Sequence, residues 1–434
     1  MSSRRISPPY RLLKWLTPGI GVKRWMAVLF CGVAALALAF ALLLLAFLRA
    51  HPIPPLEFVL TLGGASLWVR AALAAAIGVA LVTLGLIRIN RAILEPLDVG
   101  GSALIDTLLD HRQRGRGPKI VAIGGGTGLP ILLRGLKAYT ANLTAIVTVA
   151  DDGGSSGRLR RELGVPPPGD LRNNIAALAR DEALMTQLFQ YRFGEGGLEG
   201  HSLGNLFIAA LVGVTGSFEQ ALIESSRVLA VRGQVLPSTL ADVTLMADVR
   251  EAEPVGGTQR VAGESAIPLR GGAIVRAFLE PEDAPAYPGA VQAILNADLI
   301  VLGPGSLFTS ILPNLLIRGI AEAVRRSRAL KVYVCNVATQ RGETDGFSVA
   351  DHVRVIEQHA GKGLFDVVLI NDDFPPLEEG ANFSYVRLER ENGLTGLGVK
   401  VKTAPLVDRQ RPWRHDSERL ARAVMELLEE APTA

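Results

Sequence analysis

Two adjacent carboxylates, Asp151 and Asp152, follow an apolar run and are the residues of this sequence best suited to chemistry. Such a pair can bind ribose hydroxyls, coordinate Mg²⁺ or deprotonate a hydroxyl group. An alternative is an Asp-Gly turn that caps a helix beginning near Arg158. The four residues after the carboxylates offer backbone N–H groups and two hydroxyls, which suit a phosphate or a sugar; they are Gly153, Gly154, Ser155 and Ser156.

A glycine-rich turn lies upstream of the carboxylates. It follows a short apolar run at residues 120–123 and precedes residues 129–138, whose composition predicts a helix. A strand, a glycine turn and a helix N-terminus can bind an anion, because N–H groups point toward the ligand and no side chain intrudes. Leu129 stands where the dinucleotide pattern requires a third glycine, and no P-loop pattern overlaps the turn, so a turn without a ligand stays open. The candidate ligand-binding residues are Gly124, Gly125, Gly126, Thr127 and Gly128.

Three further stretches bring polar residues next to a predicted helix or strand. Asp170 can cap the helix that follows three prolines, and Arg172 or Asn173 in its first turn can face the ligand. His201 and Asn205 flank a glycine before an apolar helix, where a histidine is as readily structural as functional. The third stretch is a loop of glycines and hydroxyls, with candidate residues Gly303, Gly305, Ser306 and Thr309.

Buried strands that alternate with helices must position these residues. Short alternating runs at residues 243–249 and 259–263 predict a small antiparallel flap, and residues 417–430 predict an amphipathic closing helix. In an open α/β sheet, ligands bind beyond the carboxyl ends of the strands, where the glycine loops would meet. Five apolar runs predict a Rossmann-like α/β fold with a mostly parallel sheet and helices on both faces; they are 120–123, 143–150, 298–302, 331–337 and 366–370.

Two long apolar stretches precede this domain. Residues 25–48 carry no charge and are long enough to span a bilayer, and residues 67–89 form a second candidate span. Lysine and arginine are concentrated before the first stretch and after the second. This asymmetry predicts a transmembrane helical hairpin in a two-pass plasma-membrane protein, with both termini and the main domain in the cytoplasm and lipid as the partner of residues 25–89. A cleaved signal peptide is the alternative, although the first stretch is too long for one and no cleavage site is evident.

Charge is divided unevenly along the chain. Residues 1–95 carry ten Lys and Arg and two Asp and Glu, a net charge of +8, whereas the remainder carries 35 and 40, a net charge of −5. A mildly acidic domain argues against a nucleic-acid partner, which would require a basic face. The two cysteines allow no disulfide framework, as is typical of a cytoplasmic domain. The expected organisation is a membrane anchor at 1–95, a linker at 96–118 and a ligand-binding domain at 119–434.

Taken together, these stretches resemble the YvcK/CofD family, and specifically its YvcK branch, the gluconeogenesis factors. The resemblance runs from about residue 119 to residue 372, whereas the membrane hairpin departs from the usual family pattern of a soluble chain. It rests on motifs in a fixed order, at residues 124–129, 133–137, 148–158, 167–173, 200–206, 263–265, 303–306, 309–315 and 340–346.

The resemblance implies a Rossmann-like domain that binds a nucleotide diphosphate ligand, with a UDP-sugar of the UDP-N-acetylglucosamine type expected for this branch. It also implies a regulatory role that links carbon metabolism to cell-envelope growth and cell shape. The sister CofD branch implies an alternative, an enzyme that transfers a 2-phospholactyl group from a GDP-linked donor and uses Mg²⁺. Asp151 and Asp152 would then be the candidate catalytic or metal-binding residues. The sequence has no unmistakable general base or covalent nucleophile, which favours the regulator.

Overall fold

The computed structural model describes residues 117–431 apart from 180–181, 252–256, 379 and 389–398, together with isolated helical positions between Cys31 and Thr83. The chain divides into two compact units, Met1–Arg112 and Gln113–Ala434. The second unit contains all the strands that the structure describes, together with the helices that position the candidate site.

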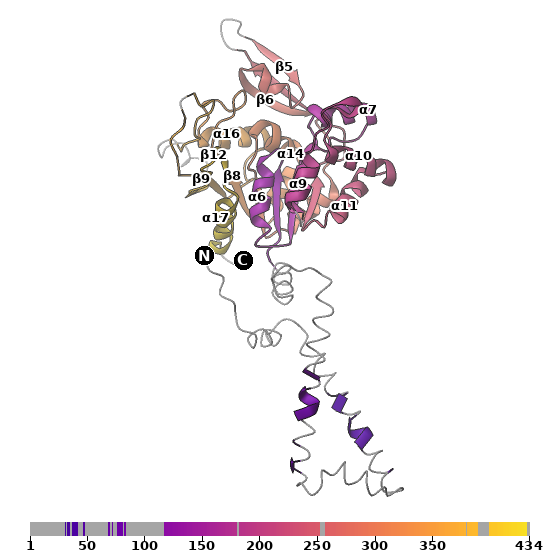
Figure 1. Ribbon diagram of the computed structural model, residues 1–434. Coiled ribbons are helices and arrows are strands. Elements are labelled where there is room, and N and C mark those ends of the chain that lie inside the picture. Colours follow the sequence, from indigo (N-terminus) through magenta and orange to yellow (C-terminus); the bar gives the residue numbers. More distant parts are fainter. Residues whose placement is uncertain are drawn as a thin grey trace. The chain divides into compact units, whose positions relative to one another are not determined.

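A seven-stranded parallel sheet forms the centre of the second unit (Figure 1). Its strand order is β10-β9-β8-β7-β1-β2-β3, so β1 lies between β7 and β2 and is buried along its whole length. Apolar runs without alternation suit such strands, because helices cover both faces of a parallel sheet. The strands are β1 (Ile120–Gly124), β2 (Leu143–Val147), β3 (Gln234–Pro237), β7 (Leu299–Leu302), β8 (Leu330–Val334), β9 (Val367–Asn371) and β10 (Lys400–Ala404).

The order of the strands reverses at β1. The chain leaves β1 toward β2 and β3, and later returns to β7 on the other side of β1 before it continues to β8 and β9. Crossovers in the two directions run over opposite faces of the sheet, so the loops after β1 and β7 diverge and leave a crevice between them. This topological switch point lies where the first and third glycine loops were expected to meet.

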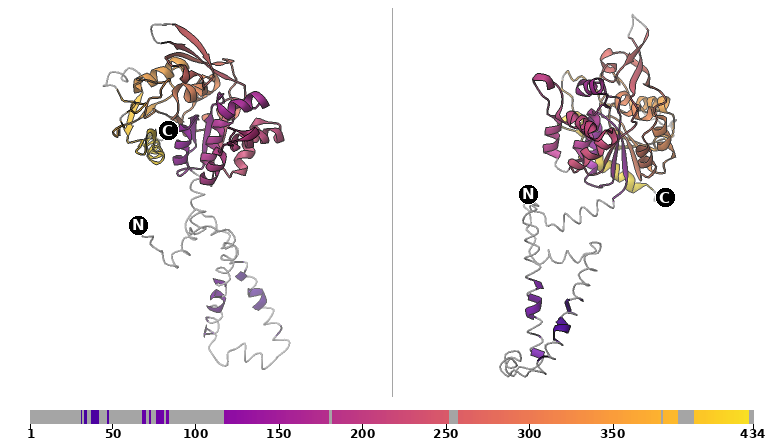
Figure 2. Two further views of the ribbon diagram at one scale, coloured as in Figure 1. Left: turned by 45° about the horizontal axis from the view of Figure 1, so that its top comes forward. Right: turned by 90° about the vertical axis from the view of Figure 1, so that its right-hand side faces the viewer.

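Helices pack on both faces of the sheet (Figure 2). One face carries α6 (Gly128–Leu136), α8 (Gly169–Leu178) and α17 (Ser417–Glu430), and the other carries α13 (Pro288–Leu295), α14 (Leu312–Leu316), α15 (Arg318–Arg326) and α16 (Val349–Ala360). The helix predicted at residues 417–430 is confirmed as α17, which begins after Asp416 because that carboxylate accepts two N–H groups of the first turn.

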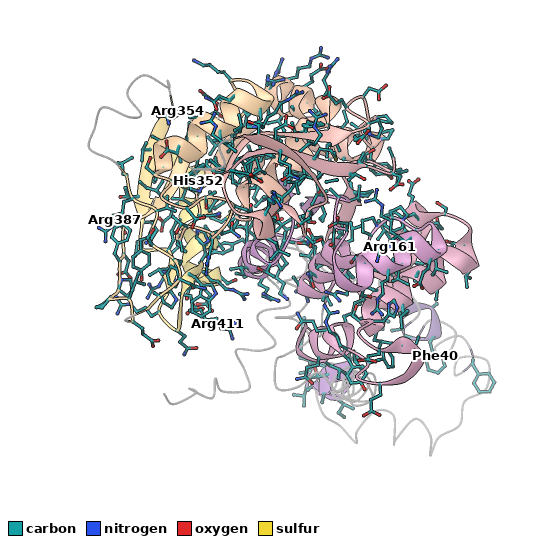
Figure 3. The ribbon with its side chains drawn as sticks, turned by 90° about the horizontal axis from the view of Figure 1, so that it is seen from above. Phe40, Arg161, His352, Arg354, Arg387 and Arg411 are labelled. Carbon is teal, nitrogen blue, oxygen red and sulfur yellow. The ribbon has the colours of Figure 1, made fainter. Side chains whose placement is uncertain are left out.

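A long excursion connects β2 to β3. It contains α7 (Gly154–Leu163), α9 (Glu182–Gln190), α10 (Leu203–Thr215) and α11 (Phe218–Val228). Arg161 of α7 lies on the opposite side of the domain from Arg387 and Arg411, which belong to the C-terminal part (Figure 3). That part also contains a two-stranded ribbon formed by β11 (Val407–Asp408) and β12 (Arg411–His415).

The predicted antiparallel flap is confirmed as a three-stranded sheet with order β5-β4-β6. Its strands are β4 (Thr244–Arg250), β5 (Thr258–Ala262) and β6 (Ala273–Glu280), and the short helix α12 (Ile267–Arg270) lies between the last two. The sequence analysis missed β6 and the edge strand β3, which is only four residues long and ends in proline. The strand expected at 143–150 ends at Val147, because the chain turns there toward the candidate site.

Among the described residues, no single helix is long and apolar enough to cross a membrane. A bent pair of helices, residues 307–316 and 318–326, meets the same test of length and composition, and its first part is buried in the core of the domain. Of the predicted spans at 25–48 and 67–89 the structure describes only scattered helical positions, and nearly all of the linker at 96–118 lies outside the described residues. The hairpin and its orientation therefore stay predictions.

Candidate functional site

The glycine loops after β1 and β7 touch each other at the switch point. A Cβ atom built at Gly128 would lie 2.5 Å from the carbonyl oxygen of Pro304, and one at Gly305 would lie 3.5 Å from that of Gly125. Asn314 in α14 joins the two segments, because its amide donates 2.9 Å to the Gly124 carbonyl and 2.7 Å to that of Ser310. The structure thus confirms that the two loops lie at one edge of the sheet.

Asp170 fixes the first glycine loop. Its carboxylate accepts the Gly126 N–H at 2.6 Å, and Gly126 adopts a positive φ of 60° that few residues other than glycine tolerate. The expectation that Asp170 caps its own helix is wrong, because α8 already begins at Gly169 and Asp170 reaches across to the loop. Gly125 and Gly126 therefore belong to the scaffold, while Thr127 and Gly128 open into the neighbouring cleft.

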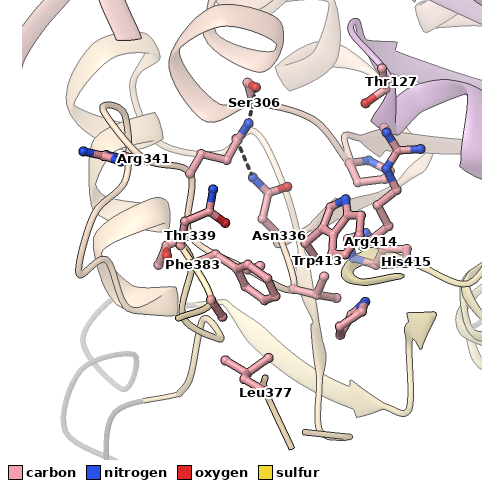
Figure 4. A pocket seen from close by; sticks show the side chains of 18 of the residues that line it. Thr127, Ser306, Asn336, Thr339, Arg341, Leu377, Phe383, Trp413, Arg414 and His415 are labelled. Carbon is pink, nitrogen blue, oxygen red and sulfur yellow. Dashed lines mark hydrogen bonds between the residues drawn. The ribbon is translucent and has the colours of Figure 1, made fainter. Parts of the chain in front are cut away.

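A cleft of about 1090 Å³ extends from these loops to the C-terminal ribbon (Figure 4). Of the predicted ligand-binding residues it is lined by Thr127, Gly128, Gly305 and Ser306. The loop after β8 supplies amide and hydroxyl groups: Gln340 donates to the Ser306 hydroxyl at 2.6 Å, and Asn336 donates to Gln340 at 3.4 Å. A cleft with hydrogen-bonding groups fixed in this way can orient a polar ligand.

The far wall of the cleft is aromatic and basic. The rings of Phe383 and Trp413 lie 6.1 Å apart at an angle of 65°, and Trp413 is half exposed. Arg414, the next residue in β12, lines the cleft and makes no ion pair among the described residues, whereas Arg409 pairs with Asp373 at 3.4 Å. The sequence analysis missed this wall, because nothing in the sequence indicates that residues 383 and 409–414 return to a loop near residue 127.

Five carboxyl groups gather beside the cleft. We call them the carboxyl cluster: Asp151, Asp152, Asp170, Glu264 and Glu343. The flap contributes through its turn, where the Ser265 N–H donates to Asp152 at 2.9 Å. Close approach requires glycine there, since a Cβ atom at Gly263 would lie 2.0 Å from the Asp152 carboxylate. Asp151 accepts the Gly153 N–H at 2.9 Å, so the turn predicted as the alternative is present together with the carboxyl cluster.

Burial is the first cause of the raised pKa values of Asp151, Asp170, Glu264 and Glu343. Burial, followed by the charges of Asp170 and Asp151, raises the pKa of Glu264 to about 10, and one oxygen of this side chain has no hydrogen-bond partner. Burial raises the pKa of Glu343 to about 7 and that of Asp170 to about 6, against hydrogen bonds that lower both. A ligand that neutralises or hydrogen-bonds these oxygens would therefore be favoured.

A hydrogen-bonded network lies behind the second glycine loop. The buried Arg172 donates to the Ser202 hydroxyl at 2.5 Å and to Asn173 at 2.9 Å. Neither Arg172 nor Asn173 lines the cleft, and the expectation that one of them faces the ligand stays a prediction. Ser155 lies 3.1 Å from the His201 ring. The network thus holds α7 and α10 in place behind the carboxyl cluster.

The remaining predicted residues divide between these two regions. Asn205 donates to Ser156 at 3.3 Å and completes the buried network. Thr309 donates to Glu343 at 3.2 Å and so connects the third glycine loop with the carboxyl cluster. Gly153 and Gly154 form the start of α7, and Gly303 adopts a positive φ of 81° where the chain leaves β7. The predicted residues are neighbours, but only four of them line the cleft.

The chemistry of the carboxyl cluster suits a hard cation such as Mg²⁺, but its geometry does not supply a site. Within residues 117–431, as far as they are described, no three His, Cys, Asp or Glu side chains converge as metal ligands would. Asp151 and Asp152 instead accept N–H groups from their own loop and from the flap.

Comparisons with known proteins assign the fold to a family. The model of the CofD family, described as 2-phospho-L-lactate transferase CofD, matches residues 120–428. The chain belongs to this family. A crystal structure of a UPF0052 family member from Bacillus halodurans is 45% identical, with a TM-score of 0.66 over 71% of this chain and 99% of that one.

Relatives in the CofD family carry the name gluconeogenesis factor. The Bacillus subtilis gluconeogenesis factor is 48% identical over 73% of this chain and 100% of its own length, and a putative gluconeogenesis factor from Nostoc sp. is 47% identical over 95% and 91%. Residues 1–118 make up more than a quarter of this chain, so the Nostoc alignment includes most of them. The N-terminal extension is therefore shared with some relatives and is not a departure peculiar to this member.

Replacing Glu343 by glutamine should flatten the pH dependence of stability. The pKa of Glu343 is raised to about 7, so between pH 4.5 and pH 7 the folded state holds a proton that the unfolded state has released. The free energy of unfolding of the wild type therefore falls as pH rises through this window, on the order of 2–3 kcal/mol from this residue. Urea unfolding at several pH values measures the difference between the two proteins.

The matched control is Glu429→Gln, which changes an exposed glutamate of α17 outside the cleft. It should retain the wild-type fall in stability. Equal pH dependence in Glu343→Gln and wild type would contradict the assigned burial of a protonated Glu343.

Proposed function

We propose that this gluconeogenesis factor of the CofD family is a membrane-anchored regulatory protein that binds a UDP-sugar of the UDP-N-acetylglucosamine type. Binding would report the supply of such a sugar and link carbon metabolism to cell-envelope growth and cell shape. The observation that carries the proposal is the cleft at the switch point, where a helix N-terminus, an unpaired arginine among the described residues and an aromatic pair line one space.

The diphosphate fits the end of the cleft formed by α6 and β12. Thr127 and Gly128 lie at the N-terminus of α6, which has no acidic residue in its first turn, and Arg414 lines the same cleft. Helix N–H groups and a guanidinium both attract phosphate oxygens. The carboxyl cluster would repel a diphosphate, so charge alone selects the end of the cleft at which the phosphates lie.

The uracil and the sugar suit the two remaining walls. Phe383 and Trp413 offer ring faces to a planar base, and Trp413 is exposed enough to be covered by one. Sugar hydroxyls need acceptors and donors, which Ser306, Gln340 and Glu343 supply along the opposite wall. The volume of about 1090 Å³ accommodates a ligand with these three parts.

A transferase of the CofD type with a GDP-linked donor and Mg²⁺ is the second candidate. The carboxyl cluster favours it, because several raised pKa values in one place are common at catalytic sites. Against it, Asp151 and Asp152 already accept backbone N–H groups, and no side chain is placed as an activated nucleophile beside a base. We therefore favour ligand binding without turnover.

Arg414→Gln should weaken binding of UDP-N-acetylglucosamine about 10- to 100-fold, because a charge-assisted hydrogen bond to phosphate is lost. Arg411→Gln is the matched control, since this arginine lies in the same strand but does not line the cleft. Isothermal titration calorimetry of the purified full-length proteins measures both. Equal affinity in Arg414→Gln and wild type would reject the proposed position of the diphosphate.

Asp151→Asn and Asp152→Asn separate the two candidate functions. For the regulator we expect UDP-sugar binding that does not change between Mg²⁺ and EDTA in the wild type and both variants, and no product from the wild type. Chromatography after incubation with a GDP-linked donor detects released GMP. Release of GMP by the wild type that needs Mg²⁺ and is lost in either variant would reject the regulator and favour the transferase.

The membrane anchor is proposed on the charge asymmetry around residues 25–48 and 67–89. Single cysteines at Ser2 and at Pro54, in a chain whose native cysteines are replaced, report the topology through an impermeant thiol reagent on intact cells. We expect labelling at position 54 only. Labelling at position 2 only would reverse the orientation. Labelling at neither position, in a protein that membrane extraction shows to be present, would reject the hairpin.

A further inference from the structure

A second cleft of about 620 Å³ lies between strand β6 of the flap and helices α14, α15 and α16. It shares no lining residue with the cleft at the switch point. Three arginines line it. Arg276 lies in β6, whereas Arg318 is the first residue of α15 and Arg325 lies in its last turn. Glu282 is the only carboxylate among the lining residues that the structure describes.

The charges of this cleft do not cancel. Glu282 pairs with Arg276 at 3.0 Å, and both side chains are largely exposed. Arg325 donates to the carbonyl oxygens of Ala360 and Lys362 at the end of α16, which holds its guanidinium in place but does not neutralise it. Arg318 makes no ion pair or hydrogen bond among the described residues. Two positive charges therefore remain without a counter-charge in the cleft.

His359 lines the cleft as a neutral group. Its Nε2 atom accepts the Ala277 N–H of β6 at 3.0 Å, so its proton is on Nδ1, 2.8 Å from the Val355 carbonyl oxygen. Burial and the nearby charge of Arg276 lower its pKa. The histidine thus fixes the flap strand against α16, and the excess charge of the cleft comes from the arginines alone.

We infer that this second cleft binds a small organic phosphate. A phosphate monoester carries about two negative charges at neutral pH, which match the excess of the arginines, and its oxygens suit the planar guanidinium fork. The uncapped N-terminus of α15 adds to the attraction, because Ile317 offers no side-chain acceptor and the first turn has no acidic residue. Phe278 and Leu315 are among the apolar residues of the lining, which suits an organic group on the phosphate.

The contacts around the second cleft reach the first one. The ring of His359 meets Phe308 edge to face at 6.1 Å, and Phe308 lies in the segment that follows the third glycine loop. The flap strand that His359 holds belongs to the same sheet as the turn that hydrogen-bonds Asp152. An occupant that fixes the flap against α15 and α16 would therefore change the affinity of the cleft at the switch point; this part of the inference rests on the proposed function.

Calorimetry with phenyl phosphate as the probe tests the second cleft in the purified full-length protein. Arg318→Gln and Arg276→Gln should each weaken binding at least tenfold. Arg326→Gln, a change on the same helix outside the cleft, should leave this binding as in the wild type. Arg318→Gln and Arg276→Gln are both tested in case one of them misfolds, and an unfolding curve of each protein detects misfolding.

Unchanged affinity in both Arg318→Gln and Arg276→Gln would overturn the inference, as would an equal loss in Arg326→Gln. Binding of phenylsuccinate as tight as that of phenyl phosphate would overturn the assignment to phosphates. A titration of UDP-N-acetylglucosamine at saturating phenyl phosphate then measures the coupling, which should shift its affinity severalfold in the wild type and not in Arg318→Gln. No shift would overturn the coupling, whereas failure of the UDP-sugar to bind at all would reject the proposed function and leave the phenyl phosphate result intact.

Discussion

The hydrogen bond from the Gly126 N–H to the Asp170 carboxylate is the interaction on which the site depends. It ties the turn after β1 to the first turn of α8, two segments that lie 44 residues apart in the chain. With Gly125 and Gly126 held in this way, the next two residues of the loop face the cleft. The bond also places a buried carboxylate within the carboxyl cluster, where burial raises the pKa of Asp170 itself, and its charge adds to the effect of burial on the pKa of Glu264.

The hydrogen bond between Gly126 and Asp170 also separates an acidic end of the site from a basic end. Negative charge collects where the second glycine loop, α8 and the flap turn converge, while the free guanidinium of Arg414 and the N-terminus of α6 lie along the cleft. Coulomb interactions with the buried carboxyl groups are weakly screened, so an anionic ligand in the cleft would lie with its charge away from the carboxyl cluster. The polarity of the cleft would select the orientation of a nucleotide more firmly than any single hydrogen bond.

The flap connects the two clefts of the domain. Its turn at Gly263 to Ser265 approaches Asp152 so closely that only glycine fits at the contact, and its strand β6 lines the second cleft. His359 holds that strand through a backbone N–H group. Hydrogen-bond ladders join its three strands, with one irregularity between Asp248 and Val249. This arrangement is the physical link through which the inferred occupant of the second cleft would affect the first.

The sequence alone determined the parts whose signals are local. The apolar run before Gly124 and the glycines after it are sufficient for a buried strand and a turn at an open sheet edge, and the periodicity of residues 417–430 specifies α17. Tertiary structure decided which residues meet. Trp413 and Arg414 share a cleft with Thr127 across almost 290 residues, and Asp170 bonds to a glycine loop instead of capping its own helix. The physical reason is that strand and helix patterns depend on near neighbours, whereas such contacts depend on how the chain crosses the sheet.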